Sequence, residues 1–208
     1  MSDITLYAFP GRTRAERVMW TLVELNMDYK LIRLDLSKGE HKSEAFRELS
    51  PSGKVPVLLH NGDVYTESLA IMEYLNSISK TKHLVPMDAK ENYIFRNRLS
   101  YGQSEIEAYL WIADQATRLT NWYSWPKGTE LDCIKLAGKS ATVINNWLDE
   151  SEYIAGDVFT MADIYFYSLL TWAQVYDLVF TDRTNEYMRE MESRDAFPEM
   201  LKAKSPTL

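Results

Sequence analysis

The segment Lys54–Leu75 constrains the fold more than any other part of this chain, because it sets three signals in a fixed order. A short apolar run is interrupted by Pro56, which has no backbone N–H to donate and therefore fits a strand start or a sheet edge. Asn61-Gly62 then separates two apolar runs, which is the strongest short-range signal of a β-hairpin. An amphipathic helix begins next, at Glu67-Ser68. The segment therefore predicts strand, tight turn, strand and helix.

The polar groups of this segment indicate the kind of ligand that it binds. Glu67-Ser68 stands at a predicted helix N-terminus, where backbone N–H groups and the helix dipole favour an anion. Val55, beside Pro56, is expected to keep a free backbone N–H and C=O next to a groove. A carboxylate, a hydroxyl and an anion-binding helix end suit a ligand that carries both an ammonium group and a carboxylate. That description fits an amino-acid moiety.

On these residues the chain resembles the soluble, cytosolic-type glutathione S-transferases, and it looks like a bacterial-type member. The family's glutathione-site pattern appears here as Lys54-Val55-Pro56 and Glu67-Ser68. The resemblance covers essentially the whole chain and implies glutathione as co-substrate. It also implies a cis Pro56, pairing of the Val55 backbone with the peptide part of glutathione, and contacts from Glu67-Ser68 to the γ-glutamyl group.

Composition excludes several other functions. The 208 residues carry a formal net charge of −7, which argues against a nucleic-acid partner. No apolar run approaches the roughly 20 residues needed to span a membrane, and the N-terminus does not look like a signal peptide. A single cysteine, Cys133, fits a reducing, cytoplasmic compartment and a small core residue. Together with three scattered histidines it forms no metal-ligand spacing.

The first 80 residues follow the order β-α-β-α-β-β-α, which makes a small α/β unit that looks like a thioredoxin-like domain. A Thr13–Glu16 capping box is expected to begin the first helix. The predicted strands and helices cover residues 4–9, 18–25, 29–34, 43–49 and the hairpin with its helix at 67–77. We expect residues 1–80 to form the glutathione-binding domain and residues 81–88 to form a linker.

Residues 89–208 are predicted to form an all-helical domain that contributes the hydrophobic substrate pocket. Helices are expected over 93–120 and 131–149. Thr160 and Asp163 match the N-cap and N3 positions of a further helix, with Phe159 and Ile164 as a hydrophobic staple. The resemblance implies that this box is structural. Aromatic side chains of this domain are candidates for the pocket or for core and dimer packing: Tyr101, Tyr109, Trp111, Trp122, Tyr123 and Trp125.

Conjugation requires the glutathione thiol as a thiolate, because the thiolate is the nucleophile. A free thiol has a pKa of about 8.5 and is mostly protonated at pH 7. Lowering that pKa by two units needs roughly 2.7 kcal/mol of preferential anion stabilisation. One charge-assisted hydrogen bond contributes about 1.5–3 kcal/mol. A single donor between the first strand and the first helix is therefore nearly sufficient.

Two residues rank level for this donor. The resemblance implies a hydroxyl four or five residues before an Arg of the first helix. Thr13 lies four residues before Arg17 and has the hydroxyl. Arg12 occupies the five-residue offset, where its guanidinium replaces the serine of some members. The alternatives are that Thr13 only caps the helix and that Arg12 is a solvated surface residue.

Tyr7 is the third candidate for the donor. Some members place a tyrosine at the end of the first strand. The Arg12–Glu16 motif, however, aligns Ala8 with that tyrosine, and strand alternation turns Tyr7 to the opposite face. Tyr7 therefore ranks behind the other two.

His41 and Lys42 follow a turn before the second predicted helix. In several classes of the family, matching residues reach the glycine carboxylate of glutathione, and Lys54 can add positive charge. The alternative is an ordinary solvated loop.

Three functions remain open. The first is conjugation of glutathione to a small hydrophobic electrophile, as in detoxification. The second is another use of glutathione, as in an isomerase or a reductive dehalogenase. The third is a non-catalytic protein of the same fold that binds glutathione or hydrophobic ligands. The resemblance implies a homodimer in each case, and the composition argues against a nucleic acid or a membrane as partner.

Overall fold

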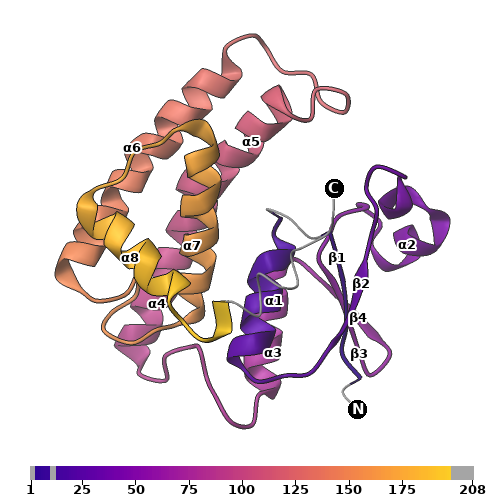
Figure 1. Ribbon diagram of the computed structural model, residues 1–208, viewed down its shortest axis with the longest axis horizontal. Coiled ribbons are helices and arrows are strands. Elements are labelled where there is room, and N and C mark those ends of the chain that lie inside the picture. The colour runs from indigo at the N-terminus through magenta and orange to yellow at the C-terminus, as the bar shows by residue number, and fades with distance from the viewer. Residues whose placement is uncertain (1–2, 10–12, 198–208) are drawn as a thin grey trace. The chain divides into compact units, whose positions relative to one another are not determined.

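The computed structural model describes residues 3–9 and 13–197, and these residues divide into two compact units (Figure 1). The first unit contains the described residues up to Leu84 together with those from Glu192 onward. The second unit runs from Val85 to Met191. The chain therefore passes from the first unit to the second and back again. The helical pattern of the sequence did not indicate this return.

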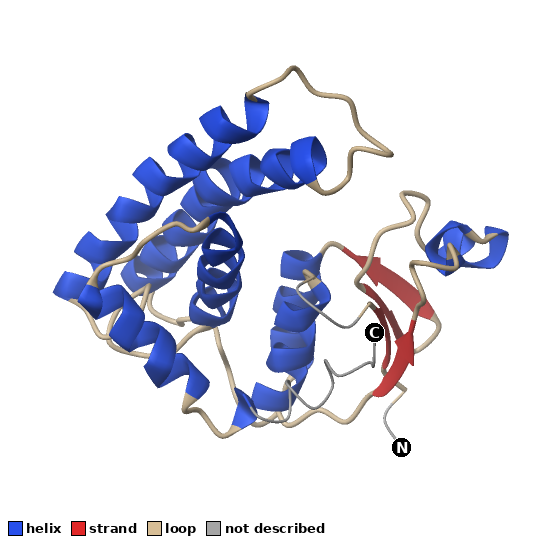
Figure 2. Ribbon diagram, turned by 45° about the horizontal axis from the view of Figure 1, so that its top comes forward, coloured by secondary structure: helices blue, strands red, loops and turns tan. Residues whose placement is uncertain are grey.

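The first unit holds a four-stranded mixed sheet (Figure 2). β1 runs parallel to β2 and antiparallel to β3, and β3 runs antiparallel to β4. The parallel connection from β1 to β2 passes through a helix, as such connections usually do. In the spatial order β2-β1-β3-β4, the strands are β2 (Lys30–Arg33), β1 (Thr5–Ala8), β3 (Val57–His60) and β4 (Asp63–Thr66).

Helices cover both faces of this sheet (Figure 1). α1 (Ala15–Glu24) and α3 (Ser68–Ile78) lie on one face, and α2 (Glu44–Leu49) lies on the other. A short 3-10 helix, Glu40–Lys42, precedes α2. This arrangement confirms the predicted thioredoxin-like βαβαββα domain.

Strand alternation decides which residues meet which helices. Tyr7 and Val57, which are paired across β1 and β3, pack with Phe46 of α2. Their neighbours Leu6 and Leu58 are also paired and fully buried. By alternation they face α1 and α3. The two central strands are therefore buried on both sides.

The hairpin between β3 and β4 forms where the sequence predicted it. His60 pairs with Asp63, so Asn61 and Gly62 alone make the turn. Both have positive φ, 54° and 88°. This is the combination that a two-residue type I′ turn requires, and it is why Asn-Gly is favoured there.

The predicted capping box at the start of α1 is wrong. The N-cap of α1 is Arg14, and no side chain caps it. The Thr13 hydroxyl donates a hydrogen bond of 2.9 Å to the carbonyl oxygen of Phe9 and accepts one of 3.3 Å from the N–H of Ala15. Thr13 therefore links Phe9, after β1, to the first residue of α1 through side-chain hydrogen bonds to the backbone.

The regular structure of the second unit is helical throughout its described residues, which confirms the predicted all-helical domain. No helix of the described chain is both long enough and apolar enough to cross a membrane. In chain order, the segments are α4 (Ala89–Tyr101), a π-helical segment (Gly102–Glu107), α5 (Ala108–Thr117), α6 (Thr129–Glu150), α7 (Met161–Ala173), a 3-10 helix (Gln174–Tyr176) and α8 (Asp182–Glu192).

The single helix predicted over 93–120 is interrupted by the π-helical segment. Gly102 begins this segment, and a Cβ there would lie 2.7 Å from Tyr165 and 2.8 Å from Phe166. Glycine therefore allows the helix to pass close to α7. At the other end of the segment, the buried carboxylate of Glu107 accepts a hydrogen bond from the Tyr165 hydroxyl.

The predicted box at the start of α7 is confirmed. Thr160 and Asp163 form a reciprocal capping box. The fully buried Asp163 carboxylate also accepts hydrogen bonds from the N–H of Ile154 (2.9 Å) and the hydroxyl of Tyr187 (3.1 Å). Burial raises the pKa of Asp163 to about 6, which leaves it ionised at pH 7. One carboxylate thus joins the 151–157 turn, α7 and α8.

We predict that Asp163→Ala lowers the free energy of unfolding by about 3–5 kcal/mol, because it leaves several buried donors without an acceptor. Urea unfolding measures the change. The control is Asp149→Ala at an exposed position of α6, which is expected to stay within about 0.5 kcal/mol. An equal effect of the two substitutions would show that the box does not carry this stability.

Candidate functional site

The register of the sheet brings the sequence-predicted segments to one end of it. Val57, the first residue of β3, pairs with Tyr7 near the end of β1 and with Thr66, the last residue of β4. Val55-Pro56 therefore enters the hairpin beside the point where Glu67-Ser68 leaves it. Both segments lie at the end of the sheet where β1 finishes.

The chain after β2 begins from the same end, because β2 is parallel to β1. It leads to the 3-10 helix that carries His41 and Lys42. A Cβ built on Gly53 would lie 2.9 Å from the carbonyl oxygen of His41. The loop that bears His41 is therefore packed directly against the loop that leads to Val55-Pro56.

Ser50 fixes the backbone in front of Val55. Its buried hydroxyl donates to the carbonyl oxygen of Lys54 (3.0 Å) and accepts from the N–H of the same residue (3.2 Å). The N–H of Gly53 donates to the carbonyl oxygen of Ser50 at 2.8 Å, which closes a turn. The sequence signal for this turn is Pro51 at its second position and Gly53 at its fourth. Sequence reasoning did not connect that signal with the site.

The residues at the entrance of β3 match the geometry that the resemblance implied. The peptide bond between Val55 and Pro56 is cis. Pro56 is buried, and Val55 packs against the cluster of Leu34, Phe46 and Val57. Within the described chain, no hydrogen bond engages the backbone N–H or C=O of Val55. Both groups therefore remain available to a ligand.

Glu67 and Ser68 stand at an uncapped helix end. Glu67 is the N-cap of α3 with φ 66° and ψ 110°, a conformation that residues other than glycine rarely adopt. No side chain caps α3, in contrast to α2, α4 and α7. The first N–H groups of such a helix have no partner within it. Glu67 is exposed and Ser68 is buried, so a carboxylate and a hydroxyl flank these donors.

His41 and Lys42 are placed differently from each other. Lys42 is exposed, whereas His41 is only 8% exposed, so its surroundings are not those of a solvated loop. Burial lowers the pKa of His41, and the neighbouring charges of Lys42 and Arg47 lower it further. His41 is therefore neutral at pH 7. It can donate a hydrogen bond but brings no charge to an anion.

The structure gives different information on each of the three candidate thiol donors. Arg12 lies outside the described residues. The proton of the Thr13 hydroxyl is engaged by the carbonyl oxygen of Phe9. Tyr7 packs its ring against Phe46, with ring centroids 5.9 Å apart. Among the described residues, no hydrogen bond engages the Tyr7 hydroxyl.

Comparison with known proteins decides the family. Residues 2–77 match the family model "Glutathione S-transferase, N-terminal domain", and residues 126–200 match "Glutathione S-transferase, C-terminal domain". A glutathione S-transferase named hmp2 from Hypomyces subiculosus is 32% identical over 158 residues, which cover 72% of this chain and 73% of that protein. The chain belongs to the glutathione S-transferase family. The expectation of glutathione as co-substrate is thereby confirmed at the level of the family.

Two solved structures show the same fold. The β-etherase LigF from Sphingobium is 20% identical, with a TM-score of 0.87 over 97% of this chain and 99% of that chain. A glutathione transferase homologue from Sulfitobacter, solved with bound glutathione, is 22% identical, with a TM-score of 0.78 over 98% of this chain and 99% of that chain. At these identities the likeness concerns the fold alone.

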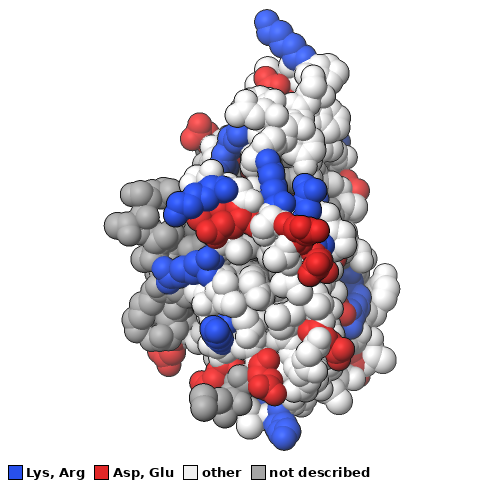
Figure 3. All heavy atoms as spheres, turned by 90° about the vertical axis from the view of Figure 1, so that its right-hand side faces the viewer, with Lys and Arg blue, Asp and Glu red and all other residues white. Residues whose placement is uncertain are grey.

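One face of this glutathione S-transferase carries surface charge of both signs. On the face that Figure 3 shows, basic and acidic side chains are interspersed, and neither sign forms a broad area. The described residues also contain no group of three His, Cys, Asp or Glu side chains that could hold a metal ion.

We predict that Gly53→Ala destabilises the protein more than Gly39→Ala. Both glycines have positive φ, 63° and 74°, so each substitution forces alanine into the left-handed region at a cost of about 1–2 kcal/mol. Only the Cβ at position 53 would also overlap a backbone atom, whereas Gly39 has nothing within 4 Å. Urea unfolding of both variants isolates the contact with His41. Equal losses would contradict close packing of the two loops.

Proposed function

We propose that this protein conjugates the thiolate of glutathione to small hydrophobic electrophiles. The observation that carries the proposal is the sheet register, which places Val55-Pro56 beside Glu67-Ser68 at the uncapped end of α3. These groups offer complementary partners to each part of the tripeptide. Membership of the glutathione S-transferase family supports the same ligand.

The γ-glutamyl group fits the α3 terminus. The Glu67 carboxylate faces its ammonium, and the Ser68 hydroxyl with the free N–H groups of the first turn binds its carboxylate. Ser68 is buried, so a hydrogen bond from its hydroxyl to the ligand carboxylate is shielded from water and is stronger than it would be at the surface. Next along the ligand, the backbone of Val55 pairs with the cysteinyl residue as a strand would.

The glycine end of the tripeptide then lies toward the loop of His41 and the turn before Val55. Lys42 and Lys54, both exposed, supply positive charge to its carboxylate. His41 supplies a neutral N–H donor. Its burial and its contact with the Gly53 turn hold it in place without a charge of its own.

The second domain supplies the electrophile pocket in this proposal. Residues 1–80 bind glutathione, residues 81–88 connect the domains, and residues 89–208 contribute the apolar lining. Aromatic rings support an apolar substrate: Trp111 has Tyr123 at 6.2 Å and Trp172 at 6.5 Å between ring centroids. Trp122 and Trp125, on the loop after α5, are exposed, as aromatic side chains that meet a ligand have to be.

A second function is favoured by the Thr13 geometry. Because the Thr13 proton is donated to Phe9, this hydroxyl activates a thiol only if that hydrogen bond breaks. If Arg12 and Tyr7 also contribute nothing, the protein binds glutathione and hydrophobic ligands without conjugating them. Use of glutathione for isomerisation or dehalogenation requires the same binding site and the same thiolate.

Glutathione affinity should depend on both residues at the α3 terminus. We expect Glu67→Gln and Ser68→Ala each to weaken binding by roughly 10- to 100-fold, because each removes one partner of a charge-assisted hydrogen bond. Isothermal titration calorimetry measures this. Glu48→Gln and Ser77→Ala are matched controls at exposed positions of α2 and α3. If the folded Glu67 and Ser68 variants bind glutathione as tightly as the wild type, the assignment of the α3 terminus as the binding site is wrong.

The thiol donor should lie between β1 and α1. We expect Arg12→Ala to lower turnover and to raise the pKa of bound glutathione by about one to two units, with a smaller effect of Tyr7→Phe. Thr13→Ala has the same effect if the Thr13 hydroxyl exchanges its hydrogen bond to Phe9 for one to the thiol. Thiolate absorbance against pH reports the pKa. Thr13→Ser keeps the hydrogen bonds to Phe9 and Ala15 and serves as the control. Loss of the thiolate in Tyr7→Phe alone would identify a tyrosine-type enzyme instead.

The protein is proposed to act in the cytoplasm, in detoxification, as a homodimer. The chain mass is 24.2 kDa. Static light scattering should therefore give about twice that mass across a wide concentration range, because a stable interface buries enough apolar surface to resist dilution. A constant mass of one chain would contradict the dimer.

A further inference from the structure

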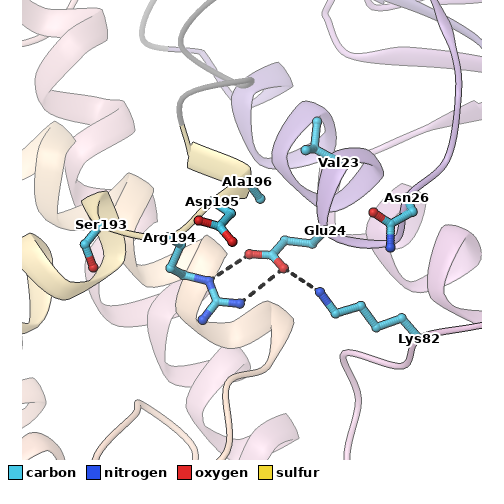
Figure 4. A pocket seen from close by; sticks show the side chains of 8 residues that line it. All are labelled: Val23, Glu24, Asn26, Lys82, Ser193, Arg194, Asp195 and Ala196. Carbon is cyan, nitrogen blue, oxygen red and sulfur yellow. Dashed lines mark hydrogen bonds and ion pairs between the residues drawn. The ribbon is translucent and has the colours of Figure 1, made fainter.

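One buried carboxylate in the first unit gathers contacts that the glutathione site does not explain. Glu24, the last residue of α1, has a side chain that is only 2% exposed. Its Oε1 accepts hydrogen bonds from Nε1 of Trp20 (3.2 Å) and Nε of Arg194 (2.8 Å). Its Oε2 accepts from Nη2 of Arg194 (3.2 Å) and Nζ of Lys82 (2.9 Å). Figure 4 shows both cations converging on this carboxylate.

The two cations come from the two places where the chain changes units. Lys82 lies two residues before Leu84, after which the chain enters the second unit. Arg194 lies two residues after Glu192, where the chain has returned to the first unit. The connections are more than a hundred residues apart in sequence, yet each is tied to the same carboxylate.

Each connection also has an anchor of its own. The N–H of Leu84 donates to the side-chain oxygen of Asn76 on α3 at 2.6 Å. The ring of Phe197 packs edge-on against Trp20 of α1, with ring centroids 5.3 Å apart. Because Trp20 also donates to Glu24, the aromatic anchor and the ion pairs share a residue. These contacts hold both connections on the helices of the first unit.

The three charged side chains of this cluster, Glu24, Lys82 and Arg194, differ in their exposure to water. The cluster lies beside an open hollow of about 620 Å³, so the Lys82 side chain is 44% exposed and that of Arg194 is 26% exposed. Glu24 has no such access. Burial on its own would raise the pKa of Glu24, but hydrogen bonds and charge from Arg194 and Lys82 outweigh it and leave that pKa below its usual value. Removing either cation therefore leaves a buried charge with less compensation.

We propose that Glu24 anchors both chain connections between the two units at a single point within the first unit. The two connections are then coupled through the carboxylate. Loss of either cation makes the buried charge of Glu24 less stable, and when the carboxylate turns toward water its contact with the other cation breaks as well.

Hydrogen exchange in the full-length protein tests the coupling without any ligand. In Arg194→Gln we expect faster amide exchange at residues 193–197 and also at residues 81–88, by about tenfold, because loss of one cation promotes local opening of both connections. The control is Arg189→Gln, the same change at an exposed position of α8. If amide exchange at residues 81–88 is as slow in Arg194→Gln as in Arg189→Gln, the proposal is overturned.

The reciprocal variant keeps the test decisive if Arg194→Gln folds poorly. Lys82→Gln should speed exchange at residues 193–197 by several-fold, roughly in line with the loss of one charge-assisted hydrogen bond. Lys80→Gln, two positions earlier and exposed, is its control. Effects confined to 81–88 would mean that the two connections are independent, which also overturns the proposal.

Discussion

The pairing of Val57 with both Tyr7 and Thr66 is the constraint on which the site depends. It sets Pro56 and Glu67 next to each other, at the end of the sheet where β1 and β2 also finish. A slip of one residue in β3 would turn Val57 away from Phe46 and expose it. The core cluster under α2 therefore enforces the same register that brings together the groups that we propose to bind glutathione.

In the proposed function, recognition of glutathione relies on groups that act at short range. The formal net charge of −7 would repel an anionic ligand at long range, and positive and negative side chains are interspersed on the face that Figure 3 shows. Against this background, the uncapped N–H groups of α3 and the exposed Lys42 and Lys54 act only on a ligand that already lies in contact. The neutral His41 adds direction rather than charge. In the proposed function, the positions of these groups give the specificity for a γ-glutamyl peptide.

The sequence predicted those features that depend on neighbouring residues. Asn61-Gly62 specifies a two-residue turn, and Thr160 with Asp163 specifies a capped helix, so both appear where they were expected. It did not show that Thr13 donates to Phe9, because a capping threonine and a turn threonine have the same local sequence. Nor did it show the burial of Glu24 under Lys82 and Arg194, since those partners are distant in sequence. The roles of the individual site residues remain proposals, because they depend on a ligand.

The central claim is that the α3 terminus selects the γ-glutamyl group, and shortening the ligand tests it most directly. Calorimetric titration of the wild-type protein compares glutathione with the dipeptides Cys-Gly and γ-Glu-Cys. We predict that loss of the γ-glutamyl group weakens binding by about 100-fold or more, since it removes charge-assisted hydrogen bonds at both Glu67 and Ser68. Loss of the glycine should weaken it less, because exposed lysines contribute less. Cys-Gly that binds as tightly as glutathione would contradict this account.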